Sequence, residues 1–299
     1  MFKLDLQFFA NNITLFKKYI DLLDEVYQLA SMTAIFDGAA ELARQGANAD
    51  ELIIPKMSMQ GLANYSRSAG YVNGDANLTN ETVKCNFDRG RMFTVDALDD
   101  IETAGLAFGR LASEFIRTKV VPELDAFRIA MYASTAGIGS PAAALLDTGD
   151  KVVAALRTCV TAMNEAEVSL ENRVLLITPT LLGLVKDMDT TKSKQVLESF
   201  SAIKEVPQSR MYTAITQNDG TTAGQEAGGY VKGAAAKNIN FLAIHKPAVI
   251  QFQKRTVPKI IRPEDNQTGD GWKFGYRDVG IADVYENKVA GVYLHKATA

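Results

Sequence analysis

The sequence predicts an α+β protein in which a long hairpin, a long helix and a strand-rich C-terminal part follow one another. Val83, Cys85 and Phe87 alternate with polar residues, which is the two-residue period of a strand with one solvated face. Apolar residues recur at three- and four-residue spacing over 98–131, so an amphipathic helix of about 50 Å is expected. Short runs of β-branched and aromatic residues then crowd 241–294.

Composition indicates an ordered protein with a substantial core. The chain has 299 residues, of which 47% are hydrophobic and 22% are charged, and this length favours two lobes over one larger core. The formal net charge is -3, and no block of like charge occurs. The chain therefore has no electrostatic footprint for nucleic acid, and any contact with DNA should be weak and local.

Neither a signal peptide nor a membrane span is expected. The first ten residues carry Asp5 within their apolar stretch and lack the basic flank of a signal peptide. No segment approaches the roughly 20 apolar residues needed to cross a bilayer. The sequence thus predicts a cytoplasmic protein, and in that reducing compartment Cys85 and Cys159 are expected to be buried thiols without a disulfide.

The N-terminal segment is expected to be an arm that packs against another surface. Ile13, Phe16, Ile20 and Leu23 form the apolar stripe of an amphipathic helix, and Gly38 and Gly46 interrupt the pattern after it. Residues 1–48 therefore lack the pattern of a self-contained unit.

The hairpin is expected within 52–95. Ile53, Met57 and Met59 alternate with polar residues in one arm, and Asn73-Gly74 is a strong hairpin-turn signal that places the tip there. Arms of this length would reach about 50 Å. A two-stranded ribbon is marginal alone in water, so it should lie on a neighbour.

The long helix should begin at the acidic segment 96–100, where carboxylates meet the positive end of the helix dipole. Pro122 should remove one hydrogen bond and kink it. The segment 135–141, rich in glycine and small residues, should end it.

An α/β lobe is expected next. It comprises a helix with an apolar stripe over 152–163, a buried strand over 174–177 and a helix that Thr178 caps and Pro179 opens. Residues 217–229 hold almost nothing that could pack, so an exposed, mobile loop is expected. The tail should add strands over 241–244, 249–252, 259–261, 272–278 and 288–294.

The sequence offers little material for catalysis, metal binding or a cofactor. Only His245 and His295 are present, and neither paired Cys/His spacing nor a phosphate-binding glycine motif occurs. Ser201 and Lys204 match the SxxK of serine acyl-enzymes without its companion motifs, a pattern that arises often by chance. No enzyme and no cofactor is predicted, although a cytosolic α/β enzyme that uses Ser201 and Lys204 stays as an alternative.

Basic residues cluster weakly at two places. They are Arg67 near the hairpin tip, and Lys254, Arg255, Lys259 and Arg262 in the tail. A solvated strand face and inter-subunit salt bridges explain them equally well, since exposed charges contribute little unless they form a network.

The order of these elements, together with two motifs, resembles the major capsid proteins of tailed bacteriophages, which have the Hong Kong 97-type capsid fold. The closing segment 282–295 (ADVYENKVAGVYLH) is similar to the last strands of that family, and 18–27 (KYIDLLDEVY) to its N-terminal arm. The resemblance covers essentially the whole chain.

The resemblance implies a division into four parts. They are an N-terminal arm (1–48), an extended loop that forms a β-hairpin (49–95), a peripheral domain with the long spine helix (96–136 and 246–299), and an axial domain (137–245).

It also implies the residues that make contacts between subunits. These would be Arg67, Tyr71, Asn73 and Gly74 of the extended loop; Asn218, Asp219 and Gly220 of an axial loop facing the five- and six-fold axes; and Glu264, Asp265 and Asn266 of a peripheral loop.

The implied function is a shell subunit. It would form hexamers and pentamers in an icosahedral procapsid that expands around double-stranded DNA, would contact scaffold and portal proteins, and would end in the virion after assembly in the bacterial host cytoplasm. Too few residues precede the hairpin for a cleaved scaffolding segment, so scaffolding is expected to come from a separate protein or to be dispensable. An encapsulin-type compartment shell, which has the same fold, is the alternative.

The resemblance raises one covalent possibility, because the family's namesake joins subunits by an isopeptide bond between a lysine on the extended loop and an asparagine on a neighbour. Residues 66–80 contain no lysine, and a guanidinium such as that of Arg67 stays protonated. Lys56 and Lys84 lie well down the arms, and Asn266 and Glu264 would suit the acceptor and helper roles. A shell without covalent cross-links is therefore expected.

Overall fold

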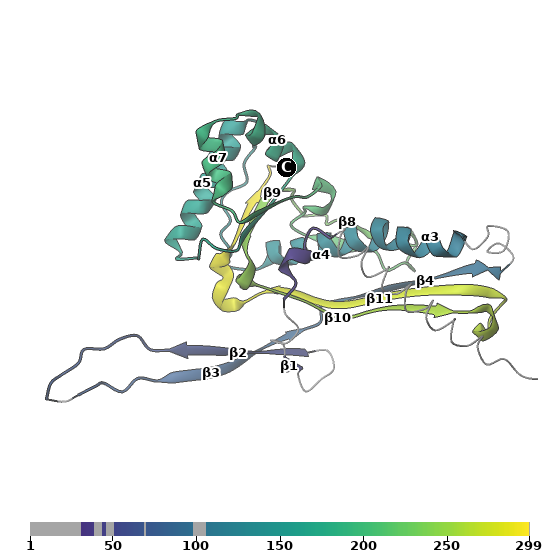
Figure 1. Ribbon diagram of the computed structural model, residues 1–299, viewed down its shortest axis with the longest axis horizontal. Coiled ribbons are helices and arrows are strands. Elements are labelled where there is room, and N and C mark those ends of the chain that lie inside the picture. Colours follow the sequence, from purple (N-terminus) through teal and green to yellow (C-terminus); the bar gives the residue numbers. More distant parts are fainter. Residues whose placement is uncertain (1–30, 39–43, 46–50, 69, 98–105, 299) are drawn as a thin grey trace, which may run out of the picture.

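The structure is a computed structural model, and it describes residues 31–38, 44–45, 51–68, 70–97 and 106–298. An α/β lobe stands on a long three-stranded sheet, and a hairpin projects away from both (Figure 1). Most of the expected arm, and the expected helix start after Ala97, lie outside the described residues. Asp96 itself ends a strand.

The hairpin and the long sheet come from adjoining segments of the chain. The first described elements are η1 (Ala34–Phe36), β1 (Arg44–Gln45), β2 (Glu51–Met59), β3 (Ala76–Lys84) and β4 (Phe87–Asp96). β1, β2 and β3 form one antiparallel sheet, whereas β4 pairs with β11 (Gly271–Val284), which in turn pairs with β10 (Val249–Ile261). The alternating segment 83–88 is thus divided between two sheets.

The spine helix is present over the described residues, and a π-helical turn lies just before its proline. α3 (Leu106–Phe115) continues through the π-helical turn η3 (Ile116–Val120) into α4 (Val121–Ser134). In η3 the Val121 N–H donates to the Ile116 carbonyl, the longer hydrogen bond of a π turn. Pro122, which has no N–H, then occupies the first turn of α4, where that donor is not needed.

The α/β lobe is built on the four-stranded sheet β12–β9–β5–β6. Its elements along the chain are α5 (Gly149–Glu165), β5 (Arg173–Ile177), α6 (Pro179–Asp187), α7 (Thr191–Glu198), β6 (Ala202–Glu205), η4 (Gln208–Arg210), β7 (Ile215–Gln217), β8 (Tyr230–Lys232) and β9 (Ile239–His245). The tail contributes η5 (Lys246–Ala248), η6 (Pro263–Asp265), η7 (Glu286–Gly291) and β12 (Val292–Lys296).

The tail is less simple than its sequence pattern predicted. The runs 249–252 and 259–261 form one strand, β10, with a register shift between Gln253 and Arg255. The last strand begins at Val292, because 286–291 form a 3-10 segment, and it pairs with β9 in the lobe. The expected peripheral range 246–299 therefore includes one strand that belongs to the other sheet.

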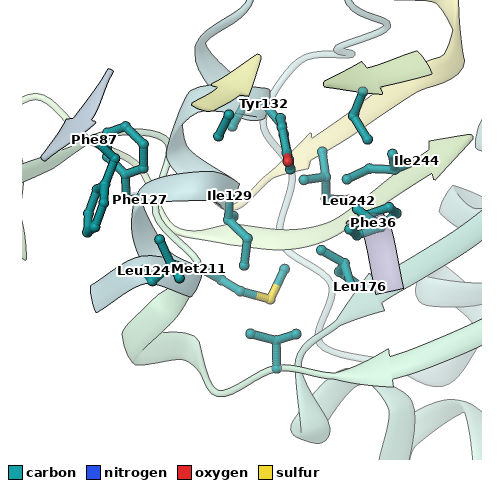
Figure 2. Packing of buried hydrophobic residues seen from close by; sticks show 14 of the residues in the cluster. Phe36, Phe87, Leu124, Phe127, Ile129, Tyr132, Leu176, Met211, Leu242 and Ile244 are labelled. Atoms are coloured by element: carbon teal, nitrogen blue, oxygen red, sulfur yellow. The ribbon is translucent and has the colours of Figure 1, made fainter. Parts of the chain in front are cut away.

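Two cores share the lobe's sheet, because alternate residues of its strands point to opposite faces. Val174 and Leu176 of β5 join a cluster with α4, η1 and the long sheet, in which Phe87 packs on Phe127 with ring centroids 5.0 Å apart (Figure 2). Leu175 and Ile177 join a second cluster beneath α5, α6 and α7. The expected buried stripes are confirmed where the structure describes them, and the side chain of Phe108 lies outside the described residues.

The contact between α5 and α6 leaves no room for a side chain at Gly149. A Cβ there would lie 2.6 Å from the Leu184 carbonyl oxygen and 2.5 Å from the Met188 Sδ. Gly149→Ala is therefore expected to lower the free energy of unfolding by about 1–3 kcal/mol, measured by urea denaturation. Gly183→Ala in α6 is the control, since nothing lies within 4 Å of its Cβ position, and alanine should stabilise that helix by about 0.5–1 kcal/mol. Equal effects at the two positions would contradict this packing.

Candidate assembly surface

The hairpin turns back at a different place from the one its sequence suggested. β2 and β3 pair in register from Glu51 opposite Lys84 to Met59 opposite Ala76, and the isolated bridge between Ser66 and Gly70 closes the tip. The predicted tip at Asn73-Gly74 is therefore wrong. The register of the paired arms centres the reversal between Ser66 and Gly70, and the positive φ of 80° belongs to Gly70.

The expected contact residues of the hairpin lie at or near this tip. Arg67 is in the turn, and Tyr71 follows it with its ring centroid 4.8 Å from that of Tyr65. Tyr71 is 87% exposed. Asn73 and Gly74 are exposed residues of the returning arm.

One face of the paired ribbon is apolar although it is exposed. Met57 lies directly opposite Leu78, and Met59 follows two residues along on the same face. These three side chains are more than 60% exposed. Ser58 and Asn77, opposite each other on the other face, are polar. Most of the exposed large apolar residues among those described lie on this hairpin, namely Met57, Met59, Leu62, Tyr65, Tyr71, Val72 and Leu78.

The base of the hairpin, in contrast, is fixed to the body. Val83 is buried against Ile250 and Ile281 of the long sheet. Just beyond it the Asn86 side chain donates to the Ala282 carbonyl (2.7 Å) and accepts from the Ala282 N–H (3.1 Å). The Asn86 side-chain amide thus makes the two hydrogen bonds that a neighbouring strand's backbone would make with Ala282, at the point where the chain passes from β3 to β4.

An ion pair adds a second attachment. Lys56 Nζ lies 2.5 Å from the Glu286 carboxylate, and this hydrogen bond raises the pKa of Lys56. Burial, followed by repulsion from Glu286, raises the pKa of Glu81 nearby. Lys56, Glu81 and Val83 share the ribbon face that meets the body, so the apolar face of Met57 and Leu78 is turned away from it.

The loop at 218–229, between β7 and β8, is ordered by its own hydrogen bonds. The Asn218 side chain donates to the Gly228 carbonyl (3.0 Å), and Asp219 accepts from the backbone N–H groups of Thr221 and Thr222. The Thr222 hydroxyl also donates to Asp219 and contributes most to the low pKa of that carboxyl. Much of the loop is exposed, as the sequence predicted.

Two arginines of β4 fasten this loop to the body. Arg89 donates to the Asn218 carbonyl (2.7 Å) and to the Glu123 carboxylate of α4 (2.8 Å), and Arg91 donates to the Glu226 carbonyl (2.9 Å). Burial raises the pKa of Glu123 despite the neighbouring Arg89. The expected axial loop therefore lies against β4, whereas α5, α6 and α7 form the free end of the lobe (Figure 1).

A cavity of about 690 Å³ lies between this loop, β4 and the spine helix. Phe93 and Phe115, whose ring centroids are 4.7 Å apart, supply part of its lining. Arg91 of β4 and Asp219 of the loop also line it.

The expected peripheral residues lie in the turn between β10 and β11. Glu264 and Asp265 are exposed. The Asn266 amide donates to the Gly271 carbonyl (2.9 Å), and its oxygen accepts from the Thr268 N–H and hydroxyl. Asn266 therefore stabilises its own turn. In the tail Lys259 is exposed and Arg262 is half-buried, and the side chains of Lys254 and Arg255 lie outside the described residues.

A buried polar cluster that the sequence analysis missed holds the end of the arm. Asp125 of α4 is fully buried, and its carboxylate accepts from the Ser31 hydroxyl, the Met32 and Thr33 N–H groups and the Thr33 hydroxyl. Arg210 also forms an ion pair with the Asp125 carboxylate, with an N–O distance of 3.0 Å. A signal for it existed in the carboxylate placed between the apolar residues Leu124 and Ala126.

A second layer of hydrogen bonds surrounds this cluster. Arg128 donates to the Thr33 hydroxyl (3.0 Å), and Gln251 of β10 donates to the Thr33 carbonyl (2.8 Å) and to Asp37 (2.6 Å). The Tyr132 hydroxyl donates to Gln251, and burial raises the pKa of that tyrosine. We name residues 31–38 with this cluster the arm clip.

The two residues considered for an enzyme, Ser201 and Lys204, lie at β6. The Ser201 hydroxyl donates to the Arg173 carbonyl (2.8 Å), at the start of β6, and Lys204 lies within that strand. Cys85 and Cys159 form no disulfide. Cys159 is buried as expected, which raises its pKa to about 12, whereas Cys85 is only half-buried. Among the described helices none has the length and apolar character needed to cross a membrane.

Comparison with known proteins matches the fold but not the sequence. No family model and no curated protein matches the chain. The structure from Gordonia phage Cozz is similar with a TM-score of 0.60 and 12% identity, over 90% of this chain and 87% of that one. The capsid of cyanophage P-SCSP1u is similar with a TM-score of 0.54 and 13% identity, over 85% of each chain.

A third similar structure is the virus-like particle from Pyrococcus furiosus, with a TM-score of 0.57 and 9% identity over 94% of this chain and 99% of that one. These likenesses confirm the expected Hong Kong 97-type capsid fold.

Proposed function

We propose that the chain is the major capsid protein of a tailed bacteriophage, which assembles into the icosahedral shell around a double-stranded DNA genome. The observation that carries the proposal is the hairpin, whose exposed apolar side chains project from a body with its own buried core. Such a surface is stabilised only when another surface covers it. The shared fold with capsid chains supports a second copy as the covering surface.

The parts of the subunit would then have the roles that the resemblance implies. The extended loop (49–95) would reach over a neighbour through Arg67, Tyr71, Asn73 and Gly74. The loop at 218–220 and the turn at 264–266 would make further contacts between subunits, and the N-terminal arm (1–48) would leave the body at the arm clip.

The assembly would contain hexamers and pentamers of this chain. We propose that it forms in the bacterial host cytoplasm, that it contacts scaffold and portal proteins and, weakly, the packaged DNA, and that the chain ends in the virion. Its role would be structural and not catalytic.

The alternative is an encapsulin-type compartment shell, which the likeness to the archaeal virus-like particle supports. The content of purified particles separates the two, because a phage shell contains double-stranded DNA and an encapsulin contains a cargo enzyme. Nuclease-resistant DNA of uniform length would favour the phage shell.

The proposal is tested by expression of the full chain followed by size-exclusion chromatography and electron microscopy. Closed particles of uniform diameter are expected, and a protein that stays monomeric at high concentration, both alone and in the co-expression described next, would refute both shell functions. Should the chain need a separate scaffold, co-expression with the neighbouring genes of its own genome is the second arm of the experiment.

The shell is expected to be held without covalent cross-links between subunits. The hairpin tip lacks a lysine, Lys56 is engaged with Glu286, and the Asn266 amide is engaged with Gly271. Mature particles boiled in detergent and reductant should run as one band near 32.5 kDa. A ladder of covalent oligomers would contradict this expectation.

A further inference from the structure

The Asn73-Gly74 pair, although typical of hairpin turns, has no turn role in the structure. The hairpin reverses between Ser66 and Gly70, and Gly74 has no positive φ, so its backbone conformation is one that any residue adopts. A Cβ at position 74 would meet the Gln60 Oε1 at the ordinary contact distance of 3.7 Å. Neither the backbone conformation nor the packing therefore requires a glycine at this position.

The pair lies in the part of the hairpin beyond the strand ladder. The last paired residues are Met59 and Ala76, and the two arms continue from them to the tip as a loop (Figure 1). Asn73 and Gly74 are both exposed to solvent in this loop. Backbone outside a ladder and without buried contacts rearranges at a low cost in free energy, so it reaches conformations that a strand excludes.

An exposed asparagine that precedes glycine can react with its own backbone, and Asn73 is the only asparagine in the sequence that glycine follows. The Gly74 nitrogen loses its proton and attacks the Asn73 Cγ. The new N–Cγ bond closes a succinimide ring, while the bond from Cγ to Nδ2 breaks and ammonia leaves. Water then opens the ring at either carbonyl, which gives aspartate or, with the main chain running through Cγ, isoaspartate. Water is consumed, ammonia is released and nothing is oxidised or reduced.

The three Asp-Gly pairs of the sequence, which could form the same ring, are held by hydrogen bonds. The glycine N–H of 37–38 donates to the Gln251 carbonyl (3.0 Å), and the glycine of 270–271 lies in the ladder between β11 and β4. At 219–220 the Thr222 hydroxyl donates to the carboxylate and lowers its pKa. That carboxyl group therefore stays ionised, and an ionised carboxylate is a poor target for a nucleophile.

We propose that Asn73 is a site of spontaneous covalent modification, at which the free subunit converts asparagine to isoaspartate and aspartate through a succinimide formed with Gly74. Three features of the pair favour the reaction, namely its exposure, the missing side chain at position 74 and its place beyond the ladder. The reaction does not depend on the proposed shell function, because it takes place in the subunit before assembly.

The modification changes both the charge and the backbone of the hairpin. Residues 60–75 carry one cation, Arg67, and one anion, Asp75, so the product gives this segment a net negative charge. Isoaspartate also adds a methylene to the main chain close to Asp75, whose N–H donates to the Gln60 Oε1 (3.3 Å) and whose carbonyl accepts from the Gln60 N–H (3.2 Å). An aged subunit therefore has a hairpin of different charge and backbone length.

Peptide mapping of the purified full chain tests the site. After incubation at mildly alkaline pH in heavy-oxygen water, free subunits are isolated by size exclusion and digested with trypsin, which releases Asn73 within the peptide 68–84. Isoaspartate and aspartate that contain one heavy oxygen should accumulate at Asn73. Asn77 and Asn80 of the same peptide are internal controls that should stay unchanged, because both lie in the ladder and neither precedes glycine. A sample digested without incubation corrects for reaction during digestion.

Two comparisons identify the cause of the reaction. Gly74→Ala fits the backbone and the available space, so it should keep the parent's melting temperature. It should slow the reaction on the order of tenfold, equivalent to about 1.4 kcal/mol in the barrier. The chain unfolded in guanidinium chloride gives the rate without tertiary structure, and the folded subunit should react at a rate of the same order of magnitude.

Isoaspartate that accumulates at Asn73 and is slowed by Gly74→Ala supports the proposal. An Asn73 that stays intact in folded subunits while the unfolded chain reacts would overturn it, as would equal reaction at Asn77. Aspartate without isoaspartate would also overturn it, because a succinimide opens in both directions. The shell function is unaffected by each of these results, since particle formation by fresh protein decides it.

Discussion

Replacement of residues 60–75 by an Asn-Gly turn is expected to abolish shell formation and leave the subunit folded. The removed residues lie beyond the last pair of the ladder, Met59 opposite Ala76, which a two-residue turn can close. They include Tyr65 and Tyr71, which are exposed and lie outside the buried clusters. The truncated protein should therefore melt cooperatively near the parent's temperature while electron micrographs show no closed particles.

Two double substitutions that keep the full length of the hairpin test whether assembly depends on its apolar face. Met57→Ser with Leu78→Ser removes the exposed apolar pair, and Ser58→Ala with Asn77→Ala changes the neighbouring pair on the polar face. We expect only the first to reduce the yield of particles, by tenfold or more. Normal particles from the truncated hairpin, or equal losses from both pairs, would remove the hairpin from the assembly surface.

The second large effect is expected at the arm clip. Asp125→Asn should lower the free energy of unfolding by about 3–5 kcal/mol, the usual result when one member of a buried ion pair is removed. The asparagine NH2 group would face the N–H and hydroxyl groups that donate to Asp125, so donor would meet donor. Arg210 would also lose the carboxylate of its ion pair. Urea denaturation of the unassembled subunit measures the loss as a lower midpoint with an unchanged slope.

The place where Asp125→Asn loosens the structure shows whether Asp125 holds the arm clip or only stabilises the core in general. Amide hydrogen exchange should accelerate first in 31–38, because the Met32 and Thr33 N–H groups lose their acceptor. The control is Asp187→Asn on the exposed end of α6, which should change stability by no more than about 0.5 kcal/mol. Protection of 31–38 at the parent's level would show that Asp125 does not hold the arm.

The sequence predictions that the structure confirmed are those in which the spacing of apolar residues matches the buried face of one helix or strand. The three-four spacing over 152–163 became α5, and the four apolar residues 174–177 became the buried strand β5. Pro179 opened α6 as expected. These elements depend on interactions between residues close in sequence and on one buried face, which the order of residue types specifies.

The failures arose where a local signal competed with a distant partner. Asn73-Gly74 is a good turn sequence, but the register of β2 with β3 fixed the reversal at Ser66 and Gly70. The segment 83–88 alternates like one strand, yet it divides between two sheets because Ala282 pairs with the side chain of Asn86.

Some features of the candidate assembly surface follow from the sequence, and others follow only from the tertiary structure. The amino-acid sequence alone determined that a long ribbon with alternating apolar and polar residues and a lysine-free tip exists, because alternation and composition are properties of contiguous residues. Only the structure showed that Met57 and Leu78 are exposed. The tertiary structure alone decided that Arg89 and Arg91 fasten the 218–229 loop, that a cavity opens beside the spine helix and that Asp125 holds residue 33. The hydrogen bonds among these features join residues more than 90 positions apart, and no periodicity in the sequence records which distant groups folding will bring together.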